Sequence, residues 1–257
     1  MAFRARTHDP YFCDVVTPDG WALFFDVDGT LVEFRSRPER VFAPRDLVAS
    51  LIELQRRFAG AVAFVSGRTI ADLDRIFFPL RLAAAGVHGA ELRRAGSHEI
   101  VRLAREPLLD ASRPRFREFC ERHPGAFLED KDLSIVLHTR ACPAASEGAS
   151  RLAEQMAAQS GGRLALQRGS HVAELRASGV DKGIALRRLL ATPPFRDRRP
   201  MVFGDDLADA DAFRACGELG GLAVAVGKDA PPAPNRLASI HACREVVHRL
   251  AEEGRRW

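Results

Sequence analysis

Three short apolar runs, each ending in polar residues, constrain the fold of this chain most strongly. The runs are Trp21–Asp26, Gly60–Val65 and Met201–Gly204. Segments with helical spacing lie between them. Continuous apolar runs of this length predict strands buried on both faces, as in a parallel sheet covered by helices. Because ligands bind at the carboxyl ends of such strands, the polar residues there are the candidate site residues.

The pattern changes in the middle of the chain. From about residue 105 to residue 175, pairs of predicted strands alternate with helices, which indicates an α+β insert with an antiparallel sheet. The helices are expected at Pro107–Arg122 and Ala145–Gln159, and a hairpin is expected to turn at Arg168–Ser170. We therefore predict a catalytic core formed by 1–104 and 176–257, interrupted by a cap at 105–175.

Composition favours an ordinary globular protein. The 257 residues are 46% hydrophobic and carry a formal charge of +4, with dispersed basic residues and few aromatics. This pattern does not favour a nucleic-acid-binding protein. The five cysteines lack metal-binding spacing, and neither a secretory signal nor an apolar stretch of 18 residues is present. We expect a cytoplasmic monomer with reduced thiols and no membrane partner.

The segment Asp26–Leu31, which reads DVDGTL, is the sharpest motif. Residues two apart on an extended segment point to the same side, so Asp26 and Asp28 present two carboxylates to one site, and Gly29 permits a tight turn. Adjacent carboxylates repel each other unless a cation lies between them, which favours a hard divalent ion such as Mg²⁺. With a phosphate present, one carboxylate can attack phosphorus while the other transfers protons.

Three more polar clusters follow predicted strands or open predicted helices. Ser66 and Arg68 offer a hydroxyl and a guanidinium to a phosphate, although Ser66 also suits a helix N-cap. Lys182 opens a predicted helix, where a cation is unfavourable unless an anion lies nearby. The segment Asp205–Asp209 holds three acids, and since a cap needs only one, three favour a metal site.

In this order, the four motifs resemble those of phosphatases of the haloacid dehalogenase (HAD) type, over most of the chain. The resemblance implies an α/β fold with a Rossmannoid parallel-sheet core and an inserted α+β cap of the C2 type. It also implies Asp26 as nucleophile, Asp28 as acid and base, Ser66 and Lys182 as phosphate ligands, and a Mg²⁺ site formed by Asp26, Asp28, Asp205 and Asp206. Direct coordination is expected from Asp26, Asp205 and the main-chain carbonyl of Asp28, whereas Asp206 and Asp209 act through water or orient the loop.

Shorter segments are similar to those of trehalose-6-phosphate phosphatases, namely GVHGAE from Gly86, EDK from Glu129 and VAEL from Val172. The resemblance implies trehalose 6-phosphate as substrate. Carboxylates and ammonium groups suit sugar hydroxyls, so we expect substrate contacts from Arg68, His88, Glu129, Lys131 and Glu174. The same side chains also suit a solvated cap surface, and His88 equally suits a structural role.

The sequence leaves other functions open. Ala208 and Ala210 stand where the metal loop of the family usually has Thr and Glu, which affects groups expected around the metal ligands rather than the ligands themselves. A phosphatase for sucrose or glucosylglycerol phosphate is a close alternative. A catalytically silent sugar-phosphate-sensing domain is an alternative of another class. The SGR segment at Ser66–Arg68 and the GxHGxE segment at Gly86–Glu91 disfavour a phosphomannomutase.

Overall fold

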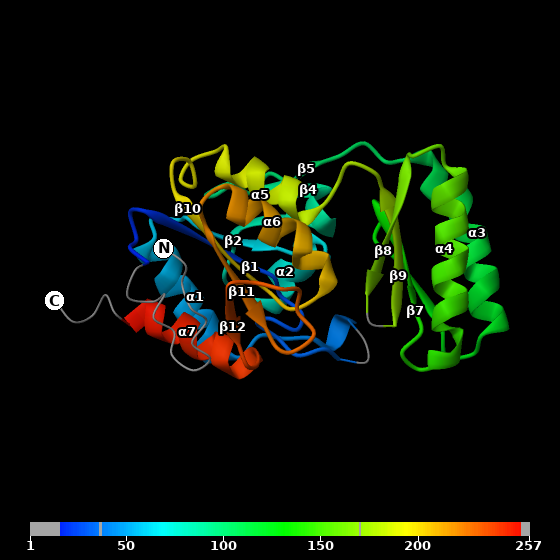
Figure 1. The fold of residues 1–257 in the computed structure, drawn as a ribbon, viewed down its shortest axis with the longest axis horizontal. Helices are drawn as coiled ribbons and strands as arrows, with labels where there is room; N and C mark the ends of the chain where they lie inside the picture. Colours follow the sequence, from blue (N-terminus) through cyan, green and yellow to red (C-terminus); the bar gives the residue numbers. More distant parts are fainter. Residues whose placement is uncertain (1–15, 36–37, 170, 253–257) are drawn as a thin grey trace. The chain divides into compact units, whose positions relative to one another are not determined.

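The computed structural model describes residues 16–35, 38–169 and 171–252 (Figure 1). The chain divides into two compact units. The first unit contains residues 1–101 and 181–257, and the second contains Arg102–Val180. The sequence had placed the boundaries of the insert at 105 and 175.

The first unit is built on a mixed sheet of eight strands among the described residues. The five strands in the order β11-β10-β1-β2-β3 run parallel, and β12 also pairs in parallel with β11. In spatial order the strands are β12 (Asn235–Leu237), β11 (Leu222–Val226), β10 (Arg199–Gly204), β1 (Trp21–Phe25), β2 (Val62–Val65), β3 (Ala83–Gly86), β4 (Glu91–Arg93) and β5 (Val101–Arg102). The polar residues after β1, β2 and β10 therefore meet at one edge of the sheet.

Helices cover this sheet. Two of them, α1 and α7, pack against each other, and α5 packs against α6, while α2 packs against β3 and β4 (Figure 1). Their bounds are α1 (Arg45–Arg57), α2 (Ile70–Ile76), α5 (Lys182–Leu190), α6 (Ala210–Glu218) and α7 (Ile240–Glu252). Short 3-10 turns lie at Pro38–Arg40, Val87–Gly89 and Leu207–Asp209. Of the helices that the structure describes, none is long and apolar enough to span a membrane.

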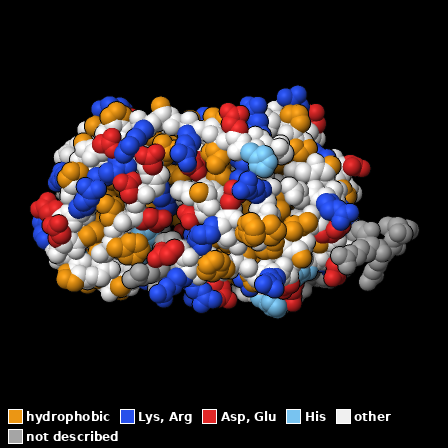
Figure 2. Space-filling view, turned by 180° about the vertical axis from the view of Figure 1, so that it is seen from behind, with side chains coloured by type: hydrophobic (Ala, Val, Ile, Leu, Met, Phe, Trp, Pro, Cys, Tyr) orange, Lys and Arg blue, Asp and Glu red, His pale blue; other side chains and the backbone are white. Residues whose placement is uncertain are grey.

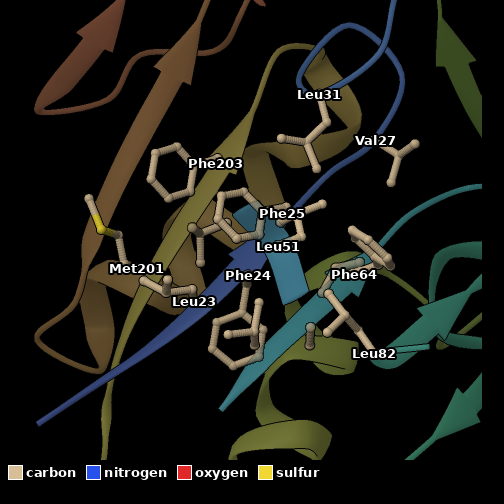
Figure 3. Close-up of a cluster of buried hydrophobic side chains, with 14 of the residues drawn as sticks. Leu23, Phe24, Phe25, Val27, Leu31, Leu51, Phe64, Leu82, Met201 and Phe203 are labelled. Atoms are coloured by element: carbon tan, nitrogen blue, oxygen red, sulfur yellow. The ribbon is translucent and has the colours of Figure 1, made fainter. Parts of the chain in front are cut away.

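The central strands are buried because their sequences are apolar throughout. Every residue of β1 is buried, and the cluster in Figure 3 shows its phenylalanines among side chains from both neighbouring strands. The rings of Phe25 and Phe203 stack with centroids 4.8 Å apart. Each fully buried side chain of this size contributes roughly 2 kcal/mol through removal of apolar surface from water. This packing gives the loop after β1 a rigid base.

The second unit is an antiparallel sheet with helices on one face. The sheet has the order β6-β7-β9-β8, and the buried residues of α3 and α4 pack with alternate residues of its strands. The elements are α3 (Pro107–Arg122), β6 (Phe127–Asp130), β7 (Ser134–His138), α4 (Ser146–Gln159), β8 (Leu164–Gly169) and β9 (Val172–Ala177), with a 3-10 turn at Pro143–Ala145. Ser170, which was expected in the hairpin turn, lies outside the described residues.

The structure also contains elements that the sequence pattern did not predict. Strand β4 was missed because its sequence, ELR, has two charged residues, both of them buried in the structure. The short strand β12 and helix α7 were also missed, although the buried residues of α7 recur at helical spacing. Strand β5 contains two residues, and both are exposed.

Candidate active site

The loop after β1 holds Asp26 at the edge of the sheet. Its amide donates to the carbonyl of Phe203 on β10 over 2.9 Å, and its side chain is buried. Gly29 has φ +81°, and a Cβ atom there would lie 1.9 Å from Oδ2 of Asp205. Glycine is therefore required at this position both for its left-handed backbone and for the close approach of the Asp205 carboxylate.

Lys182 lies between two carboxylates. Its Nζ atom is 2.9 Å from Asp26 Oδ1 and 2.7 Å from Asp209 Oδ1, and its side chain is 3% exposed. Burial alone would lower the pKa of Lys182, but the charges of Asp209 and Asp26 raise it above its ordinary value. These anions offset the unfavourable position of a cation at the first residue of α5.

A compact acidic group lies around this lysine. Carboxylate oxygens of Asp26, Asp205 and Asp209 lie within 4.8 Å of one another. Burial raises the pKa of Asp26 to about 7, although the charge of Lys182 opposes the shift. Burial and the charges of Asp26 and Asp209 raise the pKa of Asp205 to about 8.

The charge of this group fits a divalent cation. When all three acids are ionised, the ammonium of Lys182 balances one of them, and two negative charges remain in a buried site. Such an excess is unfavourable unless protons or a cation neutralise it. Three carboxylates with hard oxygen ligands suit Mg²⁺.

The loop after β10 brings Asp209 into the site and leaves Asp206 as a cap. The amides of Asp205 and Asp206 both donate to Oδ2 of Asp209, over 3.0 and 3.1 Å. The carboxylate of Asp206 accepts a hydrogen bond from the amide of Leu207. Thus Asp209, which we expected to act through water or to orient the loop, belongs to the compact acidic group, whereas Asp206 does not belong to it.

Thr30 was also missed by the sequence analysis. Its hydroxyl donates to Oδ1 of Asp205 over 2.9 Å, and the residue is fully buried. The signal was present, since Thr30 is the threonine of the DVDGTL motif. Thr30 and Asp209 together restrain Asp205, Thr30 through the carboxylate of Asp205 and Asp209 through its amide.

Asp28 faces Arg68 rather than the acidic group. The guanidinium donates two hydrogen bonds to the carboxylate, 2.5 Å from Nε to Oδ2 and 2.7 Å from the terminal nitrogen to Oδ1. Arg68 follows β2 and is itself buried. Bidentate pairs of this kind fix both partners, so the structure places the Asp28 side chain beside a group able to bind a phosphate oxygen.

The serine of the same loop does not cap the following helix. Thr69 caps α2, accepting a hydrogen bond from the amide of Asp72, whereas Ser66 Oγ accepts from the amide of Arg68 over 3.3 Å. Ser66 is buried and follows directly after β2. This leaves the carboxyl end of β2 with a hydroxyl and a guanidinium.

The GVHGAE segment packs against this loop. Val87 and His88 both have left-handed backbones, with φ of 48° and 56°, and their amides donate to the carbonyls of Arg68 and Ser66. A Cβ atom at Gly67 would lie 2.8 Å from Nε2 of His88. A β-branched residue in this conformation is strained by roughly 1–3 kcal/mol, and such strain is typical of functional sites.

The second unit carries its predicted site residues on one face of its sheet. Strand register places Glu129 and Glu174 opposite Val136, from either side. Lys131 Nζ is 3.8 Å from Oε1 of Glu174, which also accepts a hydrogen bond from the Ser134 hydroxyl. We call the face opposite α3 and α4, formed by Glu129, Lys131, Ser134, His138 and Glu174, the polar face.

Comparison with known proteins decides the family. The sequence profile of the trehalose-phosphatase family matches residues 24–237. This chain belongs to the trehalose-phosphatase family. A family member, the trehalose-6-phosphate phosphatase of Escherichia coli, is 37% identical over 221 residues, covering 86% of this chain and 82% of the relative. The probable trehalose-phosphate phosphatase of Sinorhizobium fredii is 34% identical, covering 91% and 88%.

Solved structures share the fold of this chain. A trehalose-6-phosphate phosphatase related protein aligns with a TM-score of 0.74 and 26% identity, covering 91% of this chain and 98% of that one. A haloacid dehalogenase-like hydrolase from Bacteroides thetaiotaomicron aligns at 0.64 with 16% identity, covering 89% and 99%. The predicted α/β fold with a HAD-like core is therefore confirmed.

Proposed function

We propose that this chain hydrolyses trehalose 6-phosphate to trehalose and phosphate in a Mg²⁺-dependent reaction through an aspartyl-phosphate on Asp26. The observation that carries the chemistry is the buried group of Asp26, Asp205 and Asp209 around Lys182. Membership of the trehalose-phosphatase family and the names of the relatives support the substrate.

Mg²⁺ would be held by Asp26 and Asp205, together with the main-chain carbonyl of Asp28. Asp209 would hold Lys182 and the loop after β10 that carries Asp205. When bound, the ion neutralises excess negative charge and polarises the phosphoryl oxygens. Asp26 attacks phosphorus, and the bond from phosphorus to the sugar oxygen breaks. Lys182 and Ser66 bind the phosphoryl oxygens as charge moves onto them.

Asp28 transfers the protons of both half-reactions. It donates a proton to the leaving sugar oxygen and then takes one from the water that attacks the aspartyl-phosphate. In the structure, Arg68 holds Asp28 by two hydrogen bonds. Binding of a phosphate oxygen to Arg68 would loosen this pair and leave Asp28 able to exchange its proton.

The second unit is proposed as the cap that selects the sugar. Glu129, Lys131 and Glu174 lie on the polar face, where carboxylates accept from sugar hydroxyls and the ammonium donates to them. His88 is proposed as a contact near the phosphate, because its ring lies over Gly67 in the SGR loop. The protein is proposed to act as a cytoplasmic monomer.

Phosphate release by the purified chain tests the proposal. Trehalose 6-phosphate, sucrose 6-phosphate, glucose 6-phosphate and p-nitrophenyl phosphate would be compared with Mg²⁺ and with EDTA. We expect a Mg²⁺-dependent kcat/KM about a hundredfold higher for trehalose 6-phosphate, which is about 2.7 kcal/mol of discrimination. Preference for another sugar phosphate would overturn the substrate alone, whereas no release from any ester would favour a silent sensing domain.

A further inference from the structure

His138 and Glu129 form a hydrogen-bonded pair on the polar face. The Nε2 atom of His138 lies 2.7 Å from Oε2 of Glu129. His138 on β7 pairs directly with Phe127 on β6, and Glu129 is two residues further along β6. His138 and Glu129 are therefore diagonal neighbours on the same face, a spacing that long side chains can bridge.

The imidazole of His138 is held on its other side by an aromatic ring. The rings of Phe127 and His138 are nearly parallel, at 6°, with centroids 4.3 Å apart. This stacking restricts the rotation of the His138 side chain and keeps Nε2 directed along the strand toward Glu129. The sheet register thus places the ring of Phe127, which clamps the imidazole, beside the donor His138 and the acceptor Glu129.

The direction of the hydrogen bond follows from the charge of Glu129. Burial alone would raise the pKa of Glu129, but the hydrogen bond from His138 and the charge of Lys131 hold it below its ordinary value. An ionised carboxylate only accepts hydrogen bonds, so Nε2 of His138 must carry a proton. The tautomer of His138 is assigned on this ground.

We propose that His138, clamped by Phe127, is a positioning residue that fixes the carboxylate of Glu129 for hydrogen bonding to the sugar. This inference rests on the proposed function and adds to it a residue that acts through Glu129 rather than on the substrate. The hydrogen bond to Oε2 fixes the plane of the carboxylate, so the remaining lone pairs keep one orientation. Less conformational freedom is then lost when a sugar hydroxyl binds.

Two substitutions separate the donor from the clamp. His138→Phe keeps an aromatic ring on Phe127 and removes the donor, whereas His138→Gln keeps an N–H at a similar reach and removes the stacked ring. We expect His138→Phe to lower kcat/KM for trehalose 6-phosphate roughly five- to tenfold, mainly through KM, relative to p-nitrophenyl phosphate. His138→Gln should retain a kcat/KM for trehalose 6-phosphate much closer to that of the unmodified chain than His138→Phe does.

The second unit offers a matched control. His123 also stacks on a phenylalanine, with ring centroids 4.0 Å apart, but its Nδ1 atom lies 2.8 Å from the carbonyl oxygen of Phe119 at the end of α3. His123→Phe is thus the same substitution in the same unit away from the polar face, and it should leave the ratio of the two substrates unchanged.

A double-mutant cycle tests whether His138 acts through Glu129. In a Glu129→Ala background, His138→Phe should cause less than about a twofold further loss, because the carboxylate that His138 positions is absent. Additive losses would overturn the proposal and indicate direct contact of His138 with substrate or a general packing role. Equal kcat/KM for His138→Phe and the unmodified chain would overturn it as well.

A spectroscopic readout keeps the inference separate from the proposed function. In a long-range ¹H–¹⁵N spectrum at pH 7.5, the His138 signals, assigned by their loss in His138→Phe, should show a protonated Nε2. A ring protonated at Nδ1 alone would overturn the proposal whatever the enzyme hydrolyses. If the chain prefers another sugar phosphate, the substrate assignment fails. The kcat/KM values of the same variants are then measured with that ester.

Discussion

The acidic site of the first unit and the polar face of the second unit hold charges in different ways. In the acidic site, Lys182 and Asp26 are 3% and 9% exposed and share contacts with further carboxylates. On the polar face, His138 and Glu129 are 19% and 23% exposed. Water can partly replace a lost partner in the pair of His138 and Glu129, but not in the acidic site.

This difference suits two tasks. Phosphoryl transfer requires charges that are already in place when the transition state forms, so their burial and mutual restraint are useful. Recognition of a polyhydroxyl sugar requires oriented hydrogen-bonding groups that retain contact with solvent until the ligand binds. Red, blue and orange side chains are interspersed over the face of the molecule in Figure 2, so no patch of a single charge dominates that face. The comparison predicts that substitutions in the acidic site will have the larger effects.

The largest effect is expected from Asp26→Asn. It removes the proposed nucleophile while keeping the shape of the side chain, so kcat should fall by at least about ten-thousandfold. The fold should be retained by circular dichroism, and stopped assays of phosphate release provide the measurement. A variant that kept appreciable turnover would show that no aspartyl-phosphate forms on this residue.

A matched control for this substitution is Asp197→Asn. Asp197 is exposed, lies just before β10 at the amino end of the strand, and has φ +65°, which asparagine also tolerates. It should retain full activity. A comparable loss in both variants would mean that the defect is not specific to the acidic site.

Lys182→Met tests the burial of charge directly. Methionine fills a similar volume, but it leaves Asp26 and Asp209 without their shared ammonium. We expect a loss of about 3 kcal/mol in the free energy of unfolding, measured by urea denaturation in EDTA, as for other broken buried pairs. Arg188→Met, an exposed position on the same helix, should change it by less than about 0.5 kcal/mol. Equal stability of both variants would contradict the comparison.

The sequence predicted the parts of the site that depend on strand ends. The apolar run of β1 fixes where Asp26 emerges, and the same reasoning brought Ser66 and the acids after β10 to one edge. These are local patterns, since a buried strand and the residues after it are contiguous. Helix α3 was predicted with the bounds that the structure shows, and α5 begins at Lys182 as predicted, because each has a clear N-terminal signal.

What the sequence could not predict depends on contacts between distant segments. The choice between Asp206 and Asp209 is made by the 3-10 turn at Leu207–Asp209, which directs one carboxylate to Lys182 and the other to the turn itself. Glu91 lies in the GVHGAE segment, which resembles a segment of trehalose-6-phosphate phosphatases. Its carboxylate nevertheless accepts a hydrogen bond from the amide of Ile70 at the start of α2. The pairing of Glu129 with His138 likewise requires the strand register.

A smaller effect is expected from Glu174→Ala on the polar face. Glu174 is buried and accepts from Ser134, so its loss removes a proposed sugar contact and leaves Lys131 without this partner. We expect kcat/KM for trehalose 6-phosphate to fall about a hundredfold, and that for p-nitrophenyl phosphate to fall much less. Kinetics with both esters provide the measurement.

An exposed glutamate gives the control for this prediction. Glu154 on α4 is exposed and paired only at the surface with Arg168, so Glu154→Ala should change neither ester by more than about twofold. If Glu174→Ala lowered both esters equally, the polar face would have no role in selecting the sugar.

The smallest effect is expected within the second unit, away from the polar face. Arg113 of α3 donates two hydrogen bonds to Asp130 at the end of β6. These bonds lower the pKa of Asp130 below its ordinary value. Because the side chain of Asp130 is 39% exposed, solvent screens the pair. Asp130→Asn should therefore reduce the free energy of unfolding by about 1 kcal/mol or less.

The pH dependence of stability distinguishes this pair from general acid unfolding. Because the carboxyl pKa of Asp130 is lowered in the folded state, the ionised carboxylate stabilises the fold at pH values above the ordinary pKa of 3.8. This contribution is lost as the pH falls through the lowered pKa. The difference in melting temperature between the unmodified chain and Asp130→Asn should therefore be constant near pH 7 and shrink as the pH falls below 3.8 and through the lowered pKa. Glu121→Gln, an exposed position on α3, should show no such convergence. A difference that persisted in acid would assign the role of Asp130 to packing rather than charge.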